Sequence, residues 1–347
     1  MIDSNYCELE ALSAHHVGNK EDEELHLSKN TLAVDNTELS NVLIHYFLKP
    51  FDGEELYNFT FSNNEFKLNP LFNYSESVFK DAIPFHENSI KIAQYLFDVS
   101  NHPNIKPGDL FIARFTNIKL HGEPVECLGI FKSENRHPFL TVSNETGDLS
   151  IQHTKGINVD KLDKGCLIFN KKRKDGFQVA IIDKSNKSTE AQYWKDNFLN
   201  LKPCNDGFHN TKAFLNIAKT YVTKQMPDDF VLEKTDKIDL LNRSVEYFKT
   251  KESFNKEEFE TQVFQDEQVI ESFRAFDHNY RSEHEIQIQD DFDISTQAVK
   301  KQQRLFKSIL KLDKNFHVYI HGDKSLIEKG VEADGRKFYK IYYEKED

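Results

Sequence analysis

The chain has 347 residues, 38% of them hydrophobic and 29% charged, a composition that excludes an intrinsically disordered chain and favours a soluble globular protein. No apolar run reaches the roughly 20 residues that a membrane-spanning helix needs. The formal net charge is −12, which excludes the small, strongly basic proteins that package DNA through counterion release over their whole surface.

The charge is unevenly distributed along the chain. Residues 1–100 carry 6 basic and 17 acidic residues, whereas residues 101–199 carry 15 and 12. Further on, residues 254–293 carry 3 basic and 12 acidic residues, and residues 294–347 carry 12 and 8. Two locally basic zones therefore lie within an acidic chain, and they leave room for a restricted nucleic-acid contact.

The first hundred residues predict strands followed by helices. Short strands are expected within residues 8–17 and 24–34, separated by an acidic stretch. A helix is expected over residues 36–51, capped by Asn36 or Thr37. A second helix is expected over residues 87–100. Their apolar residues recur at helical spacing: Leu39, Val42, Leu43, Tyr46 and Phe47 in the first, and Ile90, Ala93, Leu96 and Phe97 in the second.

The middle of the chain predicts an antiparallel meander. Six apolar runs of strand length are separated by turn signals such as "HGEP", "ETGD" and "KDG". They cover residues 109–118, 123–132, 138–143, 148–154, 164–170 and 177–183.

The remainder predicts helices and then a small β-hairpin. Helices are expected within residues 188–199, 210–226, 234–251, 255–284 and 295–313, and the final strands at 316–322 and 337–345 are expected to pair. The sequence therefore predicts an α+β protein with two domains. A mixed α+β domain with the antiparallel sheet covers residues 1–203, and a mainly helical domain with the terminal β-hairpin covers residues 204–347.

The first candidate site is a run of four basic residues, Lys171, Lys172, Arg173 and Lys174, followed by Asp175-Gly176. Apolar strands flank the run, and Asp-Gly is a strong hairpin-turn signal because glycine accepts positive φ. The four side chains should lie at an exposed hairpin end, where long cationic chains reach phosphates. A merely solvated turn would give the same pattern.

The second candidate site is a basic stripe on the helix expected over residues 295–313. A helical rise places Lys300, Arg304, Lys307 and Lys311 on one side of this helix, with Lys301 beside them, and the apolar residues on another. An amphipathic helix with a basic outer stripe suits contact with a phosphate backbone. Solubility alone would also explain exposed lysines.

Motifs for catalysis and metal binding are sparse. The sequence contains no GxGxxG, GxxxxGK[ST], GxSxG or HExxH pattern. Adjacent His15 and His16 fall in a predicted strand, so they point to opposite faces and cannot chelate one ion together. The four cysteines are far apart and are expected to be reduced thiols of a cytoplasmic protein. We expect no cofactor and no catalytic residues. A metal-dependent nuclease with scattered ligands stays open as an alternative.

Several longer stretches carry a resemblance to a known family. They are residues 100–115 ("SNHPNIKPGDLFIARF"), 126–142, 156–170 and 191–199, followed by "NTKAFLNIAKTYV" and the closing "GRKFYKIYY" (335–343). Together they resemble the bacterial nucleoid-associated protein family known as NdpA or YejK, in the order that the family shows, from about residue 35 to the end. The resemblance supplies no catalytic residues.

This resemblance implies a cytoplasmic protein located at the nucleoid, with DNA as its partner either directly or through another protein. Direct contact would be weak, would lack sequence specificity, and would use the two basic sites. The alternative is an adaptor that binds protein through an acidic helix expected over residues 254–293. A homodimer also stays open, and no membrane partner is expected.

Overall fold

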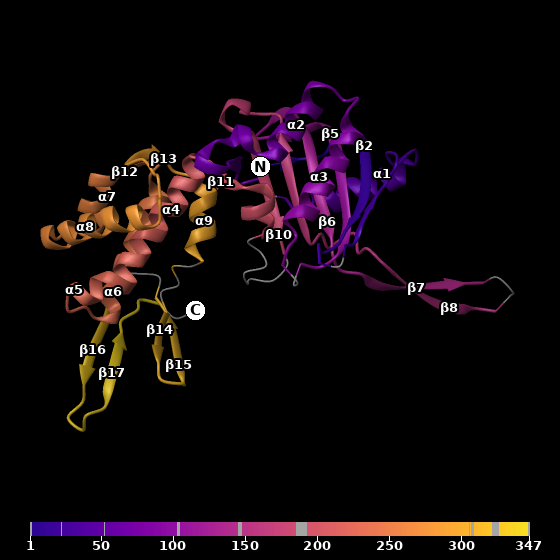
Figure 1. The fold of residues 1–347 in the computed structure, drawn as a ribbon. Coiled ribbons are helices and arrows are strands. Elements are labelled where there is room, and N and C mark those ends of the chain that lie inside the picture. Colours follow the sequence, from indigo (N-terminus) through magenta and orange to yellow (C-terminus); the bar gives the residue numbers. More distant parts are fainter. Residues whose placement is uncertain are drawn as a thin grey trace. The chain divides into compact units, whose positions relative to one another are not determined.

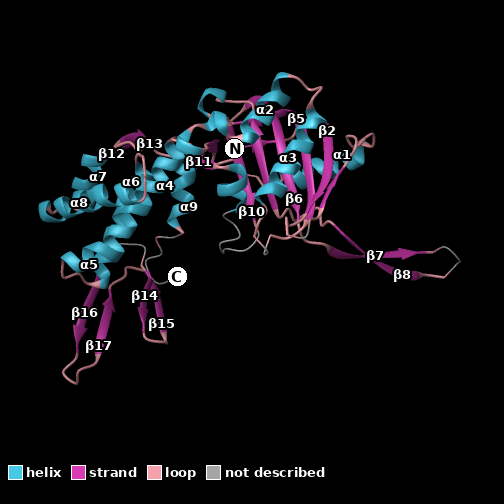
Figure 2. Ribbon diagram, in the orientation of Figure 1, coloured by secondary structure: helices cyan, strands magenta, loops and turns pink. Residues whose placement is uncertain are grey.

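The computed structural model describes residues 2–21, 23–51, 53–102, 105–144, 148–184, 193–304, 306, 309–320 and 326–345, with residues 309 and 311 described as backbone only. The chain divides into two compact units, Met1–Cys204 and Asn205–Asp347. Each unit has its own sheets, helices and hydrophobic core (Figures 1 and 2).

Unit 1 is built on one antiparallel sheet. In the part of the chain that the structure describes, the strand order is β11-β4-β10-β9-β6-β5-β2-β3, and β1 pairs with β5. The strands are β1 (Ile2–Asp3), β2 (Glu8–Val17), β3 (Leu25–Leu27), β4 (Tyr57–Phe59), β5 (Gly108–Leu120), β6 (Glu123–Ser133), β9 (Lys164–Phe169), β10 (Gln178–Asp183) and β11 (Leu201–Pro203).

The predicted meander is confirmed, with one excursion that the sequence did not indicate. Strands β7 (His137–Ser143) and β8 (Ser150–Gly156) leave the main sheet and, within the described residues, pair only with each other. Strand β6 therefore pairs directly with β9, and β9 pairs with β10. The β7–β8 ribbon is an insertion between two neighbouring strands.

Helices cover both faces of this sheet. They are α1 (Thr37–Leu48), α2 (Pro70–Lys80), α3 (Phe85–Val99) and a π-helical segment, Tyr193–Leu199. The predicted cap of α1 is confirmed, because the Asn36 side chain accepts the backbone N–H groups of Glu38 and Leu39. Its predicted apolar stripe is wrong at one end: Leu39 and Val42 are exposed, and burial is confined to the last turn.

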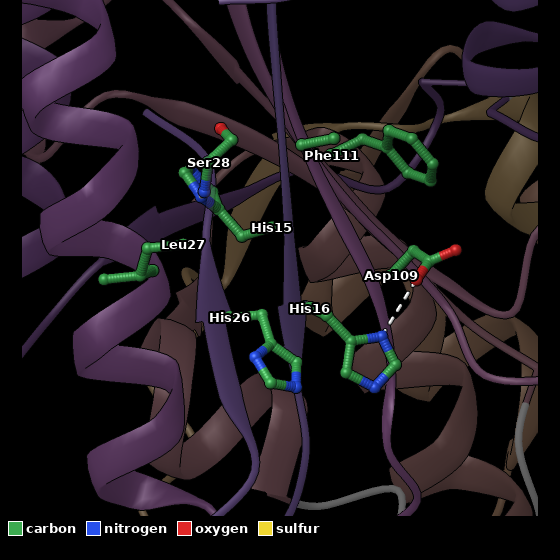
Figure 3. A pocket seen from close by; sticks show the side chains of 8 residues that line it. His15, His16, His26, Leu27, Ser28, Asp109 and Phe111 are labelled. Carbon is green, nitrogen blue, oxygen red and sulfur yellow. Dashed lines mark hydrogen bonds and ion pairs between the residues drawn. The ribbon is translucent and has the colours of Figure 1, made fainter. Parts of the chain in front are cut away.

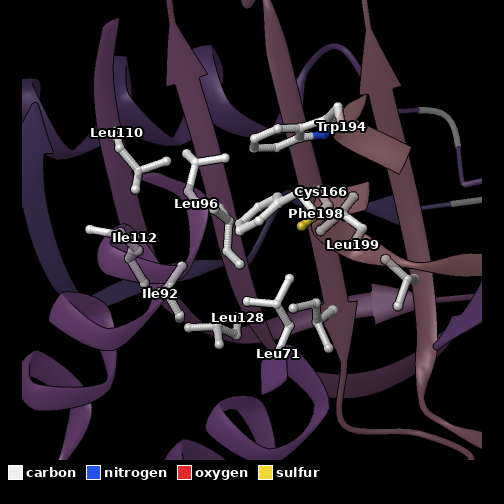
Figure 4. Close-up of a cluster of buried hydrophobic side chains, with 14 of the residues drawn as sticks. Leu71, Ile92, Leu96, Leu110, Ile112, Leu128, Cys166, Trp194, Phe198 and Leu199 are labelled. Carbon is white, nitrogen blue, oxygen red and sulfur yellow. The ribbon is translucent and has the colours of Figure 1, made fainter. Parts of the chain in front are cut away.

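One hydrophobic core lies between the sheet and the helices α2 and α3. Alternate residues of β5 and β6 point toward it, as the twofold side-chain period of a strand requires. Figure 4 shows this cluster, which includes Leu71, Ile92, Leu96, Leu110, Ile112, Leu128, Cys166, Trp194 and Phe198. On the other face, Phe47 of α1 stacks on Phe131 with ring centroids 4.3 Å apart.

A buried ionic cluster stands at the end of β6, β9 and β10. The side chains of Lys132, Lys164 and Glu134 are 0%, 2% and 3% exposed. The Glu134 carboxylate lies 3.3 Å from the Lys132 ammonium and 3.2 Å from that of Lys164. Lys164 also pairs with Asp183 at 3.3 Å, and the Tyr193 hydroxyl donates to Glu134. Burial lowers the pKa of Lys132 and raises that of Tyr193.

A buried histidine joins β2 to α3. The Nδ1 atom of His15 accepts the backbone N–H of Ser28 at 3.2 Å, so the neutral ring carries its proton on Nε2, which donates to Ser89 at 3.0 Å. Burial, together with the neighbouring His86, lowers the pKa of His15 to about 4. The fold therefore holds this side chain neutral at physiological pH.

Unit 2 packs its helices around an aromatic core that includes Phe214, Tyr221, Phe248, Phe254, Phe259 and Phe273. The helices are α4 (Gly207–Thr220), α5 (Met226–Asp229), α6 (Lys234–Thr250), α7 (Lys256–Val263), α8 (Glu267–Glu283) and α9 (Thr296–Gln303). The strands are β12 (Ser253–Asn255), β13 (Asp291–Asp293), β14 (Ile309–Leu312), β15 (Phe316–Tyr319), β16 (Ile327–Val331) and β17 (Lys337–Ile341).

The terminal β-hairpin is confirmed, but its predicted pairing is wrong. Strand β17 pairs with β16, and β15 pairs with β14, so the strands at 316–319 and 337–341 belong to two successive hairpins. The helix expected over residues 295–313 is also wrong in its second half, because α9 ends at Gln303 and β14 follows. Leu310 of β14 instead packs with Ile238 of α6 and Ile320.

The acidic segment 254–293 is not one helix, contrary to expectation. Helices α7 and α8 are separate, and the short ladder β12–β13 closes the segment. Two of its carboxylates are buried and paired: Asp277 lies 2.5 Å from the ammonium of Lys256, and Glu260 accepts from Arg274 at 2.8 Å. None of the helices in the described residues is both long and apolar enough to cross a membrane.

The buried cluster predicts a large effect of Glu134→Gln. This change leaves Lys132 and Lys164 with less compensation for their desolvation, and breaking a buried ion pair costs about 3–5 kcal/mol. The free energy of unfolding from urea titration should fall by that order. Asp98→Asn, which removes an exposed carboxylate that pairs with exposed Lys20, should cost less than about 1 kcal/mol. Equal losses in the two variants would contradict a special role for the buried cluster.

The neutral His15 predicts a pH-dependent stability. The unfolded chain takes up a proton near pH 6.5 and the folded chain only near pH 4, so the unfolded state binds more protons between these values. The stabilising contribution is complete above about pH 6.5 and declines by roughly 1–3 kcal/mol as the pH falls toward 4. Urea titrations at several pH values should show a flatter profile for His15→Gln. Substitution of exposed His26 by Gln should leave the slope unchanged.

Candidate nucleic-acid interface

The basic run lies on the loop that joins β9 and β10, residues 170–177. These strands form an antiparallel pair, so the run stands at a hairpin end as the sequence predicted. Residues Arg173–Asp175 form a short 3-10 turn, flanked by Lys172 with φ 53° and Gly176 with φ 96°. Lysine pays a steric cost in this left-handed region that glycine does not, and the anchoring of the loop holds it there.

Three contacts fix this loop against β4 and α2. The buried ring of Phe177 packs against Phe72 and Phe79, with centroids 5.0 and 5.3 Å apart. The carbonyl oxygen of Phe177 accepts from the Asn58 side chain at 2.5 Å. A Cβ on Gly176 would approach the Phe59 carbonyl oxygen to 2.7 Å, so only glycine allows this closeness. These contacts hold the backbone of the loop in one position.

Carboxylates neutralise two of the four basic side chains. Lys171 pairs with Glu123, which begins β6, and Arg173 pairs with Glu76 of α2. In contrast, Lys172 and Lys174 are exposed, and neither has a partner among the described residues. The free positive charge of the loop is therefore concentrated on these two lysines.

The pKa values of the two carboxylates agree with this pairing. The pKa of Glu76 is lowered: partial burial acts to raise it, but hydrogen bonds from Lys80 and Arg173 outweigh that effect. The hydrogen bond from Lys171 lowers the pKa of Glu123. Both carboxylates are therefore charged at neutral pH and reduce the field that the loop presents to a polyanion.

The second basic site is smaller than the sequence predicted. Lys300, Lys301 and Arg304 are exposed at the C-terminal end of α9, where cations suit the helix dipole. The Lys301 ammonium also lies 5.5 Å from the centroid of the Phe208 ring. The expected continuous stripe is wrong, because Lys311 lies in β14 and opposite His317. Lys307 lies outside the described residues.

An open pocket of about 360 Å³ lies elsewhere in unit 1, beside β2, β3 and β5 (Figure 3). In it, His16 contacts Asp109 through Nδ1 at 2.9 Å and Glu24 through Nε2 at 3.1 Å. Arg136 pairs with the same Asp109. Within the described ranges, no three His, Cys, Asp or Glu side chains are grouped in a way that would hold a metal ion.

The sequence could not reveal the two carboxylates that neutralise the loop. Glu76 and Glu123 precede their partners by 97 and 48 residues, and each lies on a different element. No local pattern links such distant positions. The acidic composition of the first hundred residues is the one related signal, and it covers Glu76 but not Glu123.

Comparison with known families gives one result that spans both units. The family model described as nucleoid-associated protein YejK matches residues 13–336. This range contains the basic loop, the end of α9 and nearly all of the described elements. No curated protein matches the chain.

Proposed function

The chain belongs to the family of the nucleoid-associated protein YejK, and we propose that it binds DNA directly, through phosphate contacts that carry no sequence information. The observation that carries this proposal is a pair of exposed lysines, Lys172 and Lys174, which have no partner among the described residues and stand on a loop that Phe177 fixes in place. A fixed loop loses little conformational freedom when it binds, so even two ammonium groups can position a phosphate backbone.

The chemistry of the loop favours phosphate contact over base readout. Lysine is a point charge without the planar fork by which arginine recognises guanine. The one arginine of the run, Arg173, already has its guanidinium on Glu76. The binding is therefore insensitive to sequence.

The same geometry predicts low affinity. Three carboxylates, of Glu76, Glu123 and Asp175, belong to the loop or its partners, and the whole chain carries −12. Few counterions are released when so few free cations meet the phosphates. The cations at the end of α9, Lys300, Lys301 and Arg304, would supply a second contact of the same kind, and Lys307 and Lys311 belong to this proposal as additional cations.

Charge reversal on the loop tests the proposal. For Lys172→Glu/Lys174→Glu, DNA affinity should fall, and the slope of log affinity against log salt should become shallower by up to about 2, since each phosphate contact contributes roughly 0.9. The matched control is Lys29→Glu/Lys91→Glu, an equal charge change on two exposed lysines, one shortly after β3 and one on α3. Fluorescence anisotropy with a labelled duplex measures both. An unchanged slope in the loop variant would show that Lys172 and Lys174 make no phosphate contacts.

Removal of the neutralising carboxylates should act in the opposite direction. Glu76→Gln/Glu123→Gln frees Arg173 and Lys171, and it should strengthen binding several-fold and steepen the salt slope. Glu54→Gln/Glu55→Gln, which removes the same charge from other positions of unit 1, separates this local effect from the overall change in charge. If the slope of log affinity against log salt became steeper in both variants, the gain in affinity would come from the change in net charge alone.

One further outcome would favour the adaptor. If the purified protein fails to bind any duplex at low salt and still enters nucleoid fractions, a protein partner at the acidic segment 254–293 becomes the better explanation. Incubation of labelled DNA with the protein and Mg²⁺ or Mn²⁺ tests the nuclease alternative, which predicts shortened products.

A further inference from the structure

Two histidines hold the chain where the edge strand β3 ends. Strand β3 has only three residues, which pair with His15, His16 and Val17 of β2, and it is the last strand on this side of the described sheet. Directly after it, Ser28 is bonded through both of its backbone groups. Its N–H donates to Nδ1 of His15 at 3.2 Å (Figure 3), and its carbonyl oxygen accepts from Nε2 of His86 on α3, also at 3.2 Å.

The two rings respond differently to a proton. The Nδ1 atom of His86 lies 2.9 Å from the hydroxyl of Ser13. A hydroxyl can donate or accept, so His86 keeps both of its contacts when its ring is charged. In contrast, Nε2 of His15 already donates to Ser89, and Nδ1 accepts a backbone N–H, which cannot become an acceptor. A proton on Nδ1 of His15 therefore sets two donors against each other and ends the contact with Ser28.

The surroundings of His15 do not stabilise a charged ring. The residue is 4% exposed, and its cross-strand neighbours are Leu27 on β3 and Leu110 on β5. Helix α3 faces it with His86 and Ser89. No carboxylate among the described residues pairs with either ring. Burial and the neighbouring His86 both lower the pKa of His15, to about 4.

The other titratable groups of these elements are directed elsewhere. Side chains alternate along strands, so His16, its neighbour His26 on β3 and its neighbour Asp109 on β5 project from the other face of the sheet. Asp109 pairs there with His16 and Arg136. The remaining charged side chains near Ser28 and on the first half of α3 are exposed: Lys29, Glu87 and Lys91.

Residues 26–31, which we call the edge segment, lie between two anchors. Before the segment, the carbonyl oxygen of Glu24 accepts the N–H of Gly18 at 2.7 Å, and the Glu24 carboxylate lies 3.1 Å from Nε2 of His16. After it, the N–H of Leu32 donates to the carbonyl oxygen of Leu12 at 2.7 Å. The edge segment can therefore leave the sheet while the chain stays attached on both sides. A proton on His16 would strengthen the first anchor, because this ring contacts carboxylates.

We propose that His15 is an acid-operated latch for the edge segment. A proton on its Nδ1 breaks the contact with Ser28, and opening of the segment lets water solvate the charged ring. The edge of β2 is then uncovered while the rest of the sheet stays folded. The fold thus contains a conformational switch whose input is pH, and the switch is independent of the basic loop.

Proton linkage gives the direction and size of the effect. In the closed state, His15 takes up a proton only near pH 4. In the open state, where water reaches the ring, it does so near the ordinary value of roughly 6.5. The open state therefore binds more protons between these values, and acid favours it. The equilibrium constant for opening should change little above about pH 7 and should rise about 30-fold between pH 7.5 and 5.

Amide hydrogen exchange of the full chain, followed by NMR, measures this opening. The protection factor divides the intrinsic exchange rate by the observed rate, so the direct effect of pH on the exchange chemistry cancels. For the Ser28 amide it should fall about 30-fold from pH 7.5 to pH 5. Buried Ala113 in the middle of β5 reports larger unfolding. Its protection factor should stay well above that of Ser28 at both pH values.

A pair of matched variants assigns the effect to His15. In His15→Asn, the amide oxygen can accept the N–H of Ser28 and the side chain takes up no proton, so the fall in protection at Ser28 should disappear. His26→Asn makes the same change at the exposed histidine of β3 and should keep the fall. A further measurement needs no variant: the ring resonances of His15 should titrate with a midpoint near pH 4.

Four results would overturn the proposal. They are a protection factor at Ser28 that does not change with pH, one equal to that of Ala113 at both pH values, a fall that persists in His15→Asn, and a His15 ring that titrates near pH 6.5. The second result would mean that the edge segment opens only together with the whole sheet. The fourth would mean that the closed segment does not hold the ring neutral.

Discussion

The shared carboxylate of Glu134 is the interaction on which the architecture of unit 1 depends. It stands just after β6 and binds the ammonium of Lys132 from that strand and of Lys164 at the start of β9. The excursion of the β7–β8 ribbon separates the two strands in sequence, so the carboxylate closes the base of the insertion. Asp163 strengthens this closure by accepting the backbone N–H groups of Glu134 and Asn135 at 2.7 and 3.0 Å.

Two surface features depend on this closure. The ribbon leaves the sheet at one end of β6 and β9, and the basic loop follows β9 at its other end. The ribbon and the basic loop therefore adjoin opposite ends of β9, and Lys164 at the start of this strand takes part in the buried ion pairs. Such a cluster is a costly way to gain stability, because desolvation offsets much of the attraction. In this fold, the cluster joins the ends of β6, β9 and β10 through paired charges.

The electrostatics of the loop explain how an acidic protein can approach a polyanion. A whole-surface attraction is excluded by the net charge of −12, so the DNA contact that we propose would depend on a few cations held at fixed positions. Glu76 and Glu123 hold Arg173 and Lys171 in place and reduce the charge that remains. We propose that binding of this kind is weak, because few cations are left to meet the phosphates.

Much of the fold could be predicted because strand and helix periods are local properties. The six runs between residues 109 and 183 became strands β5 to β10, and Asn36 capped α1 as expected. Long-range relations could not be predicted. The positions from Lys300 to Lys311 matched a helical period. However, α9 ends at Gln303, and Leu310 lies in β14, where it packs on Ile238. Similarly, "PFLTVS" and "DLSIQHT" predicted strands, but nothing local showed that they leave the sheet.

The central claim is that DNA rests on the two free lysines of the loop. The most direct test is the rate at which acetic anhydride modifies individual lysines, measured by mass spectrometry with and without duplex DNA at low salt. Our account predicts that DNA slows the modification of Lys172 and Lys174 well beyond that of exposed Lys29 and Lys91 in the same molecule. Equal rates with and without DNA at Lys172 and Lys174, under conditions in which the protein is bound, would contradict it.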